Sequence, residues 1–185
     1  MIKPNLTSHE KNGLSSYTLI NEYGLSIEVL NLGGIICSIN TPDRNGVFED
    51  IVLGFKDPKH YLGEHPYFGA VAGRYANRIA DGKFSLEGNE FTLAQNNDTN
   101  HLHGGIKGFD KVLWNVESLK NENGIQLSYT SKDGEEGYPG NLSVTVDYVL
   151  TKDNILKVKY RAQTDKTTVI NLTQHSYFNL SGDFA

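Results

Sequence analysis

Apolar and polar residues alternate along almost every periodic segment of this chain, and this period of two constrains the fold more than any other feature. In residues 141–150 the apolar side chains occupy every second position from Leu142 to Leu150. Residues 155–162 repeat the pattern after the polar turn 151–154. Successive side chains of a strand point to opposite faces of its sheet, so such runs are typical of half-buried strands. The two runs predict a β-hairpin.

Two further hairpins are expected. Residues 82–94 place Phe84 and Leu86 opposite Phe91 and Leu93, across a turn at Gly88 and Asn89. The third hairpin covers residues 112–131 and turns at 121–124. Short strands are expected within 16–31 and 33–40, followed by a polar turn at 41–46, and residues 57–63 predict one helical turn. Many short strands and 19 glycines predict an all-β fold, an antiparallel sandwich.

The charge balance indicates the kind of partner, and the single cysteine and the absence of long apolar runs indicate the cellular location. The chain carries 17 basic and 22 acidic residues in scattered positions, which argues against nucleic acid or an anionic membrane and favours a small, nearly neutral partner. Cys37 lies in an apolar run and is expected to be a small buried hydrophobe. With no apolar leader at the amino end and no apolar run long enough for a membrane span, a cytoplasmic location is predicted.

Four segments are too polar, too aromatic or too rich in glycine to serve only as sheet. Residues 65–82 carry Arg74 and Arg78 among small side chains, where each cation points to solvent or reaches into a cavity. Residues 133–143 form a turn-rich loop whose acids, Glu135 and Glu136, are weak candidates for function because loop acids are usually solvated.

Residues 96–105 contain a pair of histidines separated by one residue. A strand would place His101 and His103 on one face, and with His175 they would make a three-nitrogen metal site of the cupin type. The nearest following carboxylate, Asp110, lies beyond a glycine-rich turn, which weakens this hypothesis.

The fourth segment, residues 171–182, surrounds His175 with amides, hydroxyls and aromatic rings. Histidine titrates near neutral pH, so His175 is a candidate general acid or base. The alternative is a buried histidine whose ring is hydrogen-bonded by Thr173 or Ser176. A sugar site typically combines side-chain amides, which hydrogen-bond to two adjacent sugar hydroxyls, with aromatic rings that pack against the C–H side of the sugar ring.

Taken together, residues 73–84, 100–114, 133–140 and 171–182 resemble the aldose 1-epimerase family, the galactose mutarotases. The resemblance implies a β-supersandwich that holds a hexose in an open cleft. It also implies an isomerase that interconverts the α and β anomers of galactose or glucose, without a metal or an organic cofactor.

The resemblance also implies roles for individual residues. Asn77 and Arg78 match a pair that contacts sugar hydroxyls, and His103 matches a catalytic histidine near the ring oxygen and anomeric centre. His175 matches the general acid. The residues after it belong to the same substrate-binding segment (Ser176, Tyr177, Phe178). No family role falls on His101.

In the family the general base is a glutamate far toward the carboxyl end, beyond residue 185. The resemblance therefore implies that residues 1–185 are one β-sandwich domain and the amino-terminal half of a longer mutarotase domain, without its base. A non-catalytic carbohydrate-binding fragment is the alternative function. A homodimer, or pairing with the carboxyl-terminal half, is the expected assembly.

Overall fold

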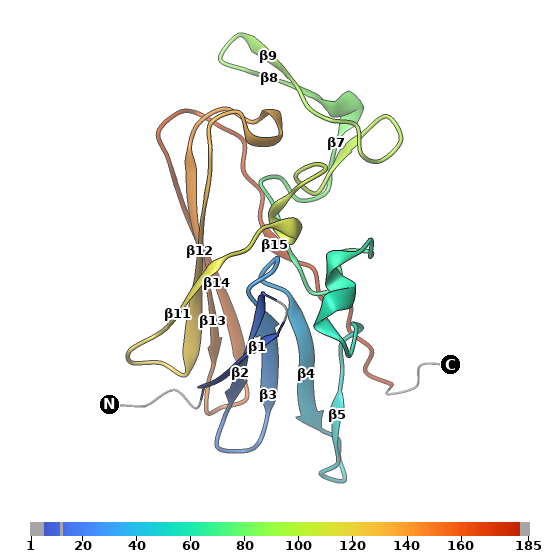
Figure 1. Ribbon diagram of the computed structural model, residues 1–185, viewed down its shortest axis with the longest axis vertical. Coiled ribbons are helices and arrows are strands. Elements are labelled where there is room, and N and C mark those ends of the chain that lie inside the picture. Colours follow the sequence, from blue (N-terminus) through green and yellow to red (C-terminus); the bar gives the residue numbers. More distant parts are fainter. Residues whose placement is uncertain (1–5, 12, 182–185) are drawn as a thin grey trace.

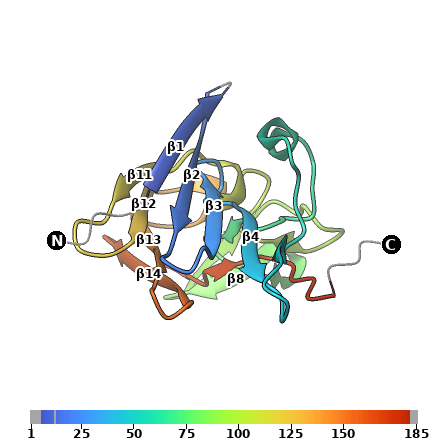
Figure 2. The same ribbon diagram turned by 90° about the horizontal axis from the view of Figure 1, so that it is seen from below.

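The computed structural model describes residues 6–11 and 13–181, and its longer strands build two antiparallel sheets (Figure 1). In each sheet, neighbouring strands follow one another along the chain. The first sheet contains β1 (Leu6–Lys11), β2 (Leu14–Ile20), β3 (Ser26–Leu30), β4 (Ile36–Pro42) and β5 (Phe48–Asp50). The second contains β11 (Asn115–Ser118), β12 (Gly124–Ser131), β13 (Leu142–Leu150) and β14 (Leu156–Thr164). The predicted sandwich is confirmed, and both views show its two layers (Figure 2).

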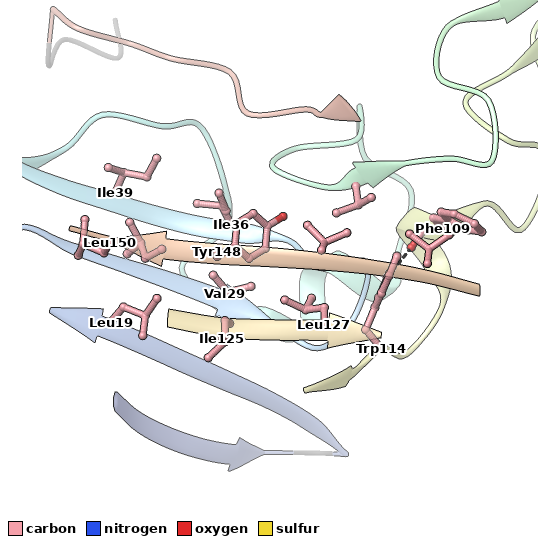
Figure 3. Packing of buried hydrophobic residues seen from close by; sticks show 14 of the residues in the cluster. Leu19, Val29, Ile36, Ile39, Phe109, Trp114, Ile125, Leu127, Tyr148 and Leu150 are labelled. Carbon is pink, nitrogen blue, oxygen red and sulfur yellow. Dashed lines mark hydrogen bonds between the residues drawn. The ribbon is translucent and has the colours of Figure 1, made fainter. Parts of the chain in front are cut away.

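The alternating apolar residues meet between the sheets (Figure 3). Leu19, Val29 and Ile36 come from the first sheet, and Ile125 and Leu127 from the second; all are almost completely buried in one cluster. Burial of a large aliphatic side chain contributes roughly 1.5–3 kcal/mol, so this cluster is the main source of the sandwich's stability. A second, smaller cluster contains Cys37, which is buried as expected. Burial raises the pKa of its thiol.

The predicted hairpins are confirmed, with small shifts in two turns: Gly124 and Asn89, both expected in turns, are the first residues of β12 and β9. Strands β13 and β14 pair with Leu150 opposite Leu156, and β11 pairs with β12. In the hairpin predicted at residues 82–94, β8 (Lys83–Leu86) pairs with β9 (Asn89–Thr92) and Phe84 stacks on Phe91. Asn89 belongs to the second strand and lies opposite Leu86, so the turn lies one residue earlier than predicted. Phe84 faces Phe91 as expected, but Leu86 does not face Leu93.

Between β5 and β11 the chain leaves the sandwich and forms short elements beside one end of it (Figure 1). These include the 3₁₀ turn η1 (Pro58–Leu62), which confirms the helical turn expected there. The others are β6 (Val71–Ala72), β7 (Arg78–Ile79), η2 (Ala80–Gly82), β10 (His101–Leu102) and η3 (Phe109–Lys111). The 3₁₀ turn η4 (Glu135–Gly137) and β15 (Thr173–Gln174) follow later in the chain.

Two pairings between these short strands bring distant segments together. Strand β15 pairs with β6, and β10 pairs with β7 so that Leu102 lies opposite Arg78. The residues that follow β15 and β10 are His175 and His103, which are thereby fixed beside the segment that carries Arg78. None of the described helices is long and apolar enough to span a membrane.

Candidate functional site

The imidazoles of His103 and His175 lie edge to face, with 4.9 Å between their ring centroids. Each follows a short strand that is paired to the segment 70–80. The backbone N–H of His175 donates to the carbonyl of Ala70, and its carbonyl accepts from Gly69 N–H. The topology therefore brings together the two histidines that the sequence singled out.

Aromatic rings surround the two imidazoles. The ring of Tyr67 lies 4.5 Å from that of His103 and 6.0 Å from that of His175, and Tyr177 lies 5.1 Å from His175. Phe68 in turn contacts Tyr177 edge-on at 5.3 Å. Tyrosine and phenylalanine faces pack well against the C–H side of a sugar ring. Tyr67 was missed by the sequence analysis, although two adjacent aromatics before Gly69 in a non-alternating segment were a usable signal.

One hydrogen bond fixes the tautomer of His103. The backbone N–H of Asn77 donates to Nδ1 of His103 at 3.0 Å. An accepting Nδ1 carries no proton, so the neutral ring holds its hydrogen on Nε2. Burial first, and then the charges of His175 and Arg78, lower the pKa of His103 to about 4. At neutral pH this histidine is therefore a neutral donor through Nε2.

Arg78 presents its guanidinium beside the imidazoles. Its Nε donates to Oδ1 of Asn97 at 2.8 Å, and its backbone N–H donates to Oδ1 of Asn77 at 2.9 Å. The side chain is exposed, and within residues 6–11 and 13–181 no protein group is bonded to its two Nη atoms. Four N–H donors therefore remain for a ligand, in the planar fork that suits pairs of oxygens.

Arg74, four residues earlier, has a structural role. Its side chain is only 2% exposed, and its donors reach Ser131 Oγ and the carbonyls of Ser131, Lys132 and Pro139 at 2.7–3.0 Å. Of the two arginines, one reaches into the protein and the other faces solvent, so both outcomes that the sequence left open occur.

The prediction that His101 and His103 share a face of one strand is wrong. Strand β10 ends at Leu102, and His103 has a left-handed backbone with φ of 52°, which turns its side chain away from the strand alternation. His101 is fully buried, and its ring nitrogens bond to the carbonyl of Ala94 and the hydroxyl of Tyr138, both at 2.7 Å. Both nitrogens are thus occupied, and no group of three metal-ligating side chains occurs in the described part of the chain. The three-histidine hypothesis does not fit this geometry.

The two acids of residues 133–143 hold other parts of the fold. Glu135 accepts from the hydroxyls of Tyr129 and Ser131 at 2.8 and 2.6 Å. Glu136 accepts from the backbone N–H groups of Ile106 and Lys107 at 3.0 and 2.8 Å. Glu135 is therefore bonded to strand β12 and Glu136 to the backbone at residues 106–107, which explains their presence without a catalytic role.

The segment after His175 splits between two sides. Tyr177 contacts His175, whereas Ser176 and Phe178 line a cavity of about 320 Å³ together with Ile36 and Val158 of the two sheets. The structure does not bring Ser176 and Phe178 to the imidazole pair. The hydroxyl of Ser176 is buried with no hydrogen-bond partner in the described residues, and neither it nor Thr173 bonds the ring of His175. The alternative reading of His175, as a histidine held by those two residues, does not hold.

The lowered pKa of His103 predicts a stability change on acidification. A group whose folded-state pKa lies below its ordinary value of 6.5 contributes stability above pH 6.5 that is lost as the pH falls toward about 4. The free energy of unfolding should therefore fall more steeply between pH 6.5 and 4 in the wild type than in His103→Gln. Urea unfolding of both proteins at several pH values measures this difference; parallel profiles would contradict the assigned pKa.

The fold and the aromatic-lined histidine pair define the class: a galactose mutarotase-like β-sandwich. The structure resembles a GalM/aldose epimerase homologue from C. elegans with a TM-score of 0.85 and 30% identity, over 90% of this chain and 51% of that one. It also resembles galactose 1-epimerase from Lactobacillus acidophilus with a TM-score of 0.84 and 32% identity, over 97% of this chain and 54% of that one.

Sequence comparison gives the family. The aldose 1-epimerase family model matches residues 15–184. Galactose mutarotase from Sus scrofa is 54% identical over 158 residues, which is 85% of this chain and 45% of that protein. Aldose 1-epimerase from Escherichia coli is 39% identical over 166 residues, or 90% and 48%. The chain belongs to the aldose 1-epimerase family, and it spans about half the length of these relatives.

Proposed function

We propose that the intact gene product containing this chain is an aldose 1-epimerase that interconverts the α and β anomers of a hexose such as galactose or glucose. The observation that carries the proposal is the His103–His175 pair at 4.9 Å, with the guanidinium of Arg78 beside it. Relatives named galactose mutarotase and aldose 1-epimerase support the reaction and the substrate class.

The chemistry assigns different tasks to the two histidines. Opening a pyranose requires a proton on the ring oxygen while another leaves the C1 hydroxyl. His103, with a pKa of about 4, is neutral near pH 7 and can only donate a hydrogen bond from Nε2. His175 is therefore the proton donor in this proposal, and positioned acid catalysis of this kind contributes about 10²–10⁴-fold.

The rest of the site holds the sugar. Arg78 and the exposed side chain of Asn77 bind ring hydroxyls, and Tyr67 and Tyr177 cover the C–H face of the ring. The general base is proposed to come from outside this chain, as in the family, because Glu135 is already bonded to β12 and Glu136 to the backbone of Ile106 and Lys107. The single sandwich as half of a longer domain, a cytoplasmic location and catalysis without a cofactor remain predictions from the sequence.

Polarimetry tests the proposed reaction. The intact gene product is added to freshly dissolved α-galactose, and the approach to the equilibrium rotation is timed. We expect the rate to exceed that of buffer and to scale with protein concentration, whereas heat-unfolded protein should give the buffer rate. A native protein that leaves the rate unchanged would contradict the proposal.

A non-catalytic carbohydrate-binding function is the second candidate. It is favoured by one observation: in the described residues, no carboxylate is bonded to either imidazole. Calorimetry with galactose on the 185-residue chain, combined with polarimetry, separates the two. Binding without turnover by both this chain and the intact gene product would favour the second candidate.

A further inference from the structure

Two adjacent asparagines, Asn96 and Asn97, connect the two parts of the site that come from different strands. Asn97 bonds to Arg78, which lies on β7, and Asn96 bonds to the turn that follows β10 and carries His103. Both asparagines are half-buried; Asn97 begins the turn 97–100, and Asn96 directly precedes it.

The turn itself is held rigidly. The N–H of Asn97 donates to the carbonyl of Asn100 at 3.1 Å, and the N–H of Asn100 returns a bond to the carbonyl of Asn97 at 2.9 Å. These reciprocal bonds close a two-residue loop in which Asp98 has a φ of 52°. A closed loop of this kind offers a fixed point from which a side chain can orient a neighbour.

Asn97 uses only its carbonyl oxygen toward Arg78. Oδ1 accepts from Nε at 2.8 Å, which orients the plane of the guanidinium without using either Nη atom. An exposed arginine otherwise samples many rotamers, and fixing its side chain before the ligand arrives removes part of the entropic cost of binding.

Asn96 uses both ends of its amide. Its Nδ2 donates to the carbonyls of Leu102 and Gly105 at 3.0 and 2.9 Å, and its Oδ1 accepts from Leu102 N–H at 2.7 Å. These three bonds hold Leu102 and Gly105, which lie on either side of His103, whose backbone is left-handed. They hold a backbone conformation that residues other than glycine adopt rarely.

We propose that Asn96 and Asn97 are positioning residues of the hexose site, with Asn97 orienting Arg78 and Asn96 holding the turn that places His103. The proposal rests on the proposed function and adds to it two residues that touch neither the substrate nor the reacting atoms. The same substitution, asparagine to aspartate, should be tolerated at residue 97 and should impair catalysis at residue 96.

The substitution is asparagine to aspartate. Asn97→Asp keeps the accepting oxygen and should preserve KM for galactose within about twofold, whereas Asn97→Ala removes the bond to a charged donor and should raise KM about tenfold. Asn96→Asp places carboxylate oxygens against two carbonyls. It should therefore lower kcat about tenfold or more, as Asn96→Ala does.

Kinetics of the intact gene product by polarimetry, with circular dichroism to verify folding, measure these effects. In an Arg78→Ala background, Asn97→Ala should add less than about twofold, because the bonded partner is gone. Asn115→Ala is the control, since that exposed amide lies on β11 and donates to Ser128 Oγ on the neighbouring strand at 3.5 Å. Equal KM values for Asn97→Ala and the wild type, or preserved kcat in Asn96→Asp, would overturn the proposal.

A spectroscopic readout separates this proposal from the proposed function. The NMR signal of the Arg78 Nε–H should keep its position in Asn97→Asp and move in Asn97→Ala, whether or not the protein turns over galactose. The His103 pKa should rise from about 4 in Asn96→Asp. A wild type without turnover whose signals respond in this way would contradict only the proposed function. An active wild type whose signals do not respond would contradict only the positioning roles.

Discussion

Replacing His175 with alanine is expected to lower kcat for galactose mutarotation by about 10²–10⁴-fold, which corresponds to roughly 3–5 kcal/mol of transition-state stabilisation. The reason is that His103 cannot substitute for it. The pKa of His103 is held near 4 by burial, by His175 and by Arg78, so close to pH 7 almost no protonated His103 is available. KM should change less, because the other proposed sugar contacts, Arg78 and the aromatic rings, are retained.

Stopped-flow or conventional polarimetry over a range of galactose concentrations measures both constants. His9→Ala is the matched control, since His9 is an exposed histidine on β1 in the first sheet. The unfolding free energy of His175→Ala should stay within about 1 kcal/mol of the wild type. If kcat falls less than about fivefold in a folded variant, His175 is not the acid.

Alanine substitutions at Arg74 and Arg78 should have opposite effects: the first should lower stability, and the second should weaken galactose binding. Arg74→Ala leaves the carbonyls of Ser131, Lys132 and Pro139 without the donor of a buried guanidinium, and it removes the cation that interacts with Glu135. Loss of a buried charged partner costs about 3–5 kcal/mol, so this variant should be strongly destabilised. Arg78→Ala removes an exposed side chain and should change stability by at most about 0.5 kcal/mol.

For galactose binding the larger effect is expected from Arg78→Ala and not from Arg74→Ala. Arg78→Ala should raise KM about 10–100-fold, because bonds from a charged donor to the ligand contribute about 1.5–3 kcal/mol. Arg78→Lys should restore little, since an ammonium lacks the planar fork. Urea unfolding and polarimetry on both alanine variants test the pair. A stable Arg74→Ala, or an Arg78→Ala with unchanged KM, would contradict the division of roles.

Strand alternation predicted the sandwich because its strands are long enough to show a period of two. Strand β13 contributes apolar residues at every second position, and its hairpin with β14 followed from that pattern. Strand β1 was not predicted because Leu6–Lys11 is mostly polar and shows no apolar alternation. The two-residue strands β6, β7, β10 and β15 are too short for any period, and their pairings follow from the tertiary structure alone.

For the same reason the site was only partly predictable. Family resemblance selected His103, His175 and Arg78, and the short strands bring them together. The prediction that His101 and His103 share a face was wrong because it assumed that the strand continues through residue 103. His103 instead adopts a positive φ, which no residue pattern in the sequence indicates. Arg74 and Arg78 look alike in sequence. Only the loop 131–139, which closes over Arg74, distinguishes them.

Histidine NMR gives the most direct test that one hexose engages both imidazoles. The ring signals of His103 and His175 in the intact gene product are followed while galactose is added. Because the ring centroids lie 4.9 Å apart, both signals should move together with a single Kd, while those of the buried His101 and of the exposed His9 on β1 stay in place. Binding of galactose that leaves the signals of His103 and His175 unchanged, or that moves them with different Kd values, would contradict the shared site.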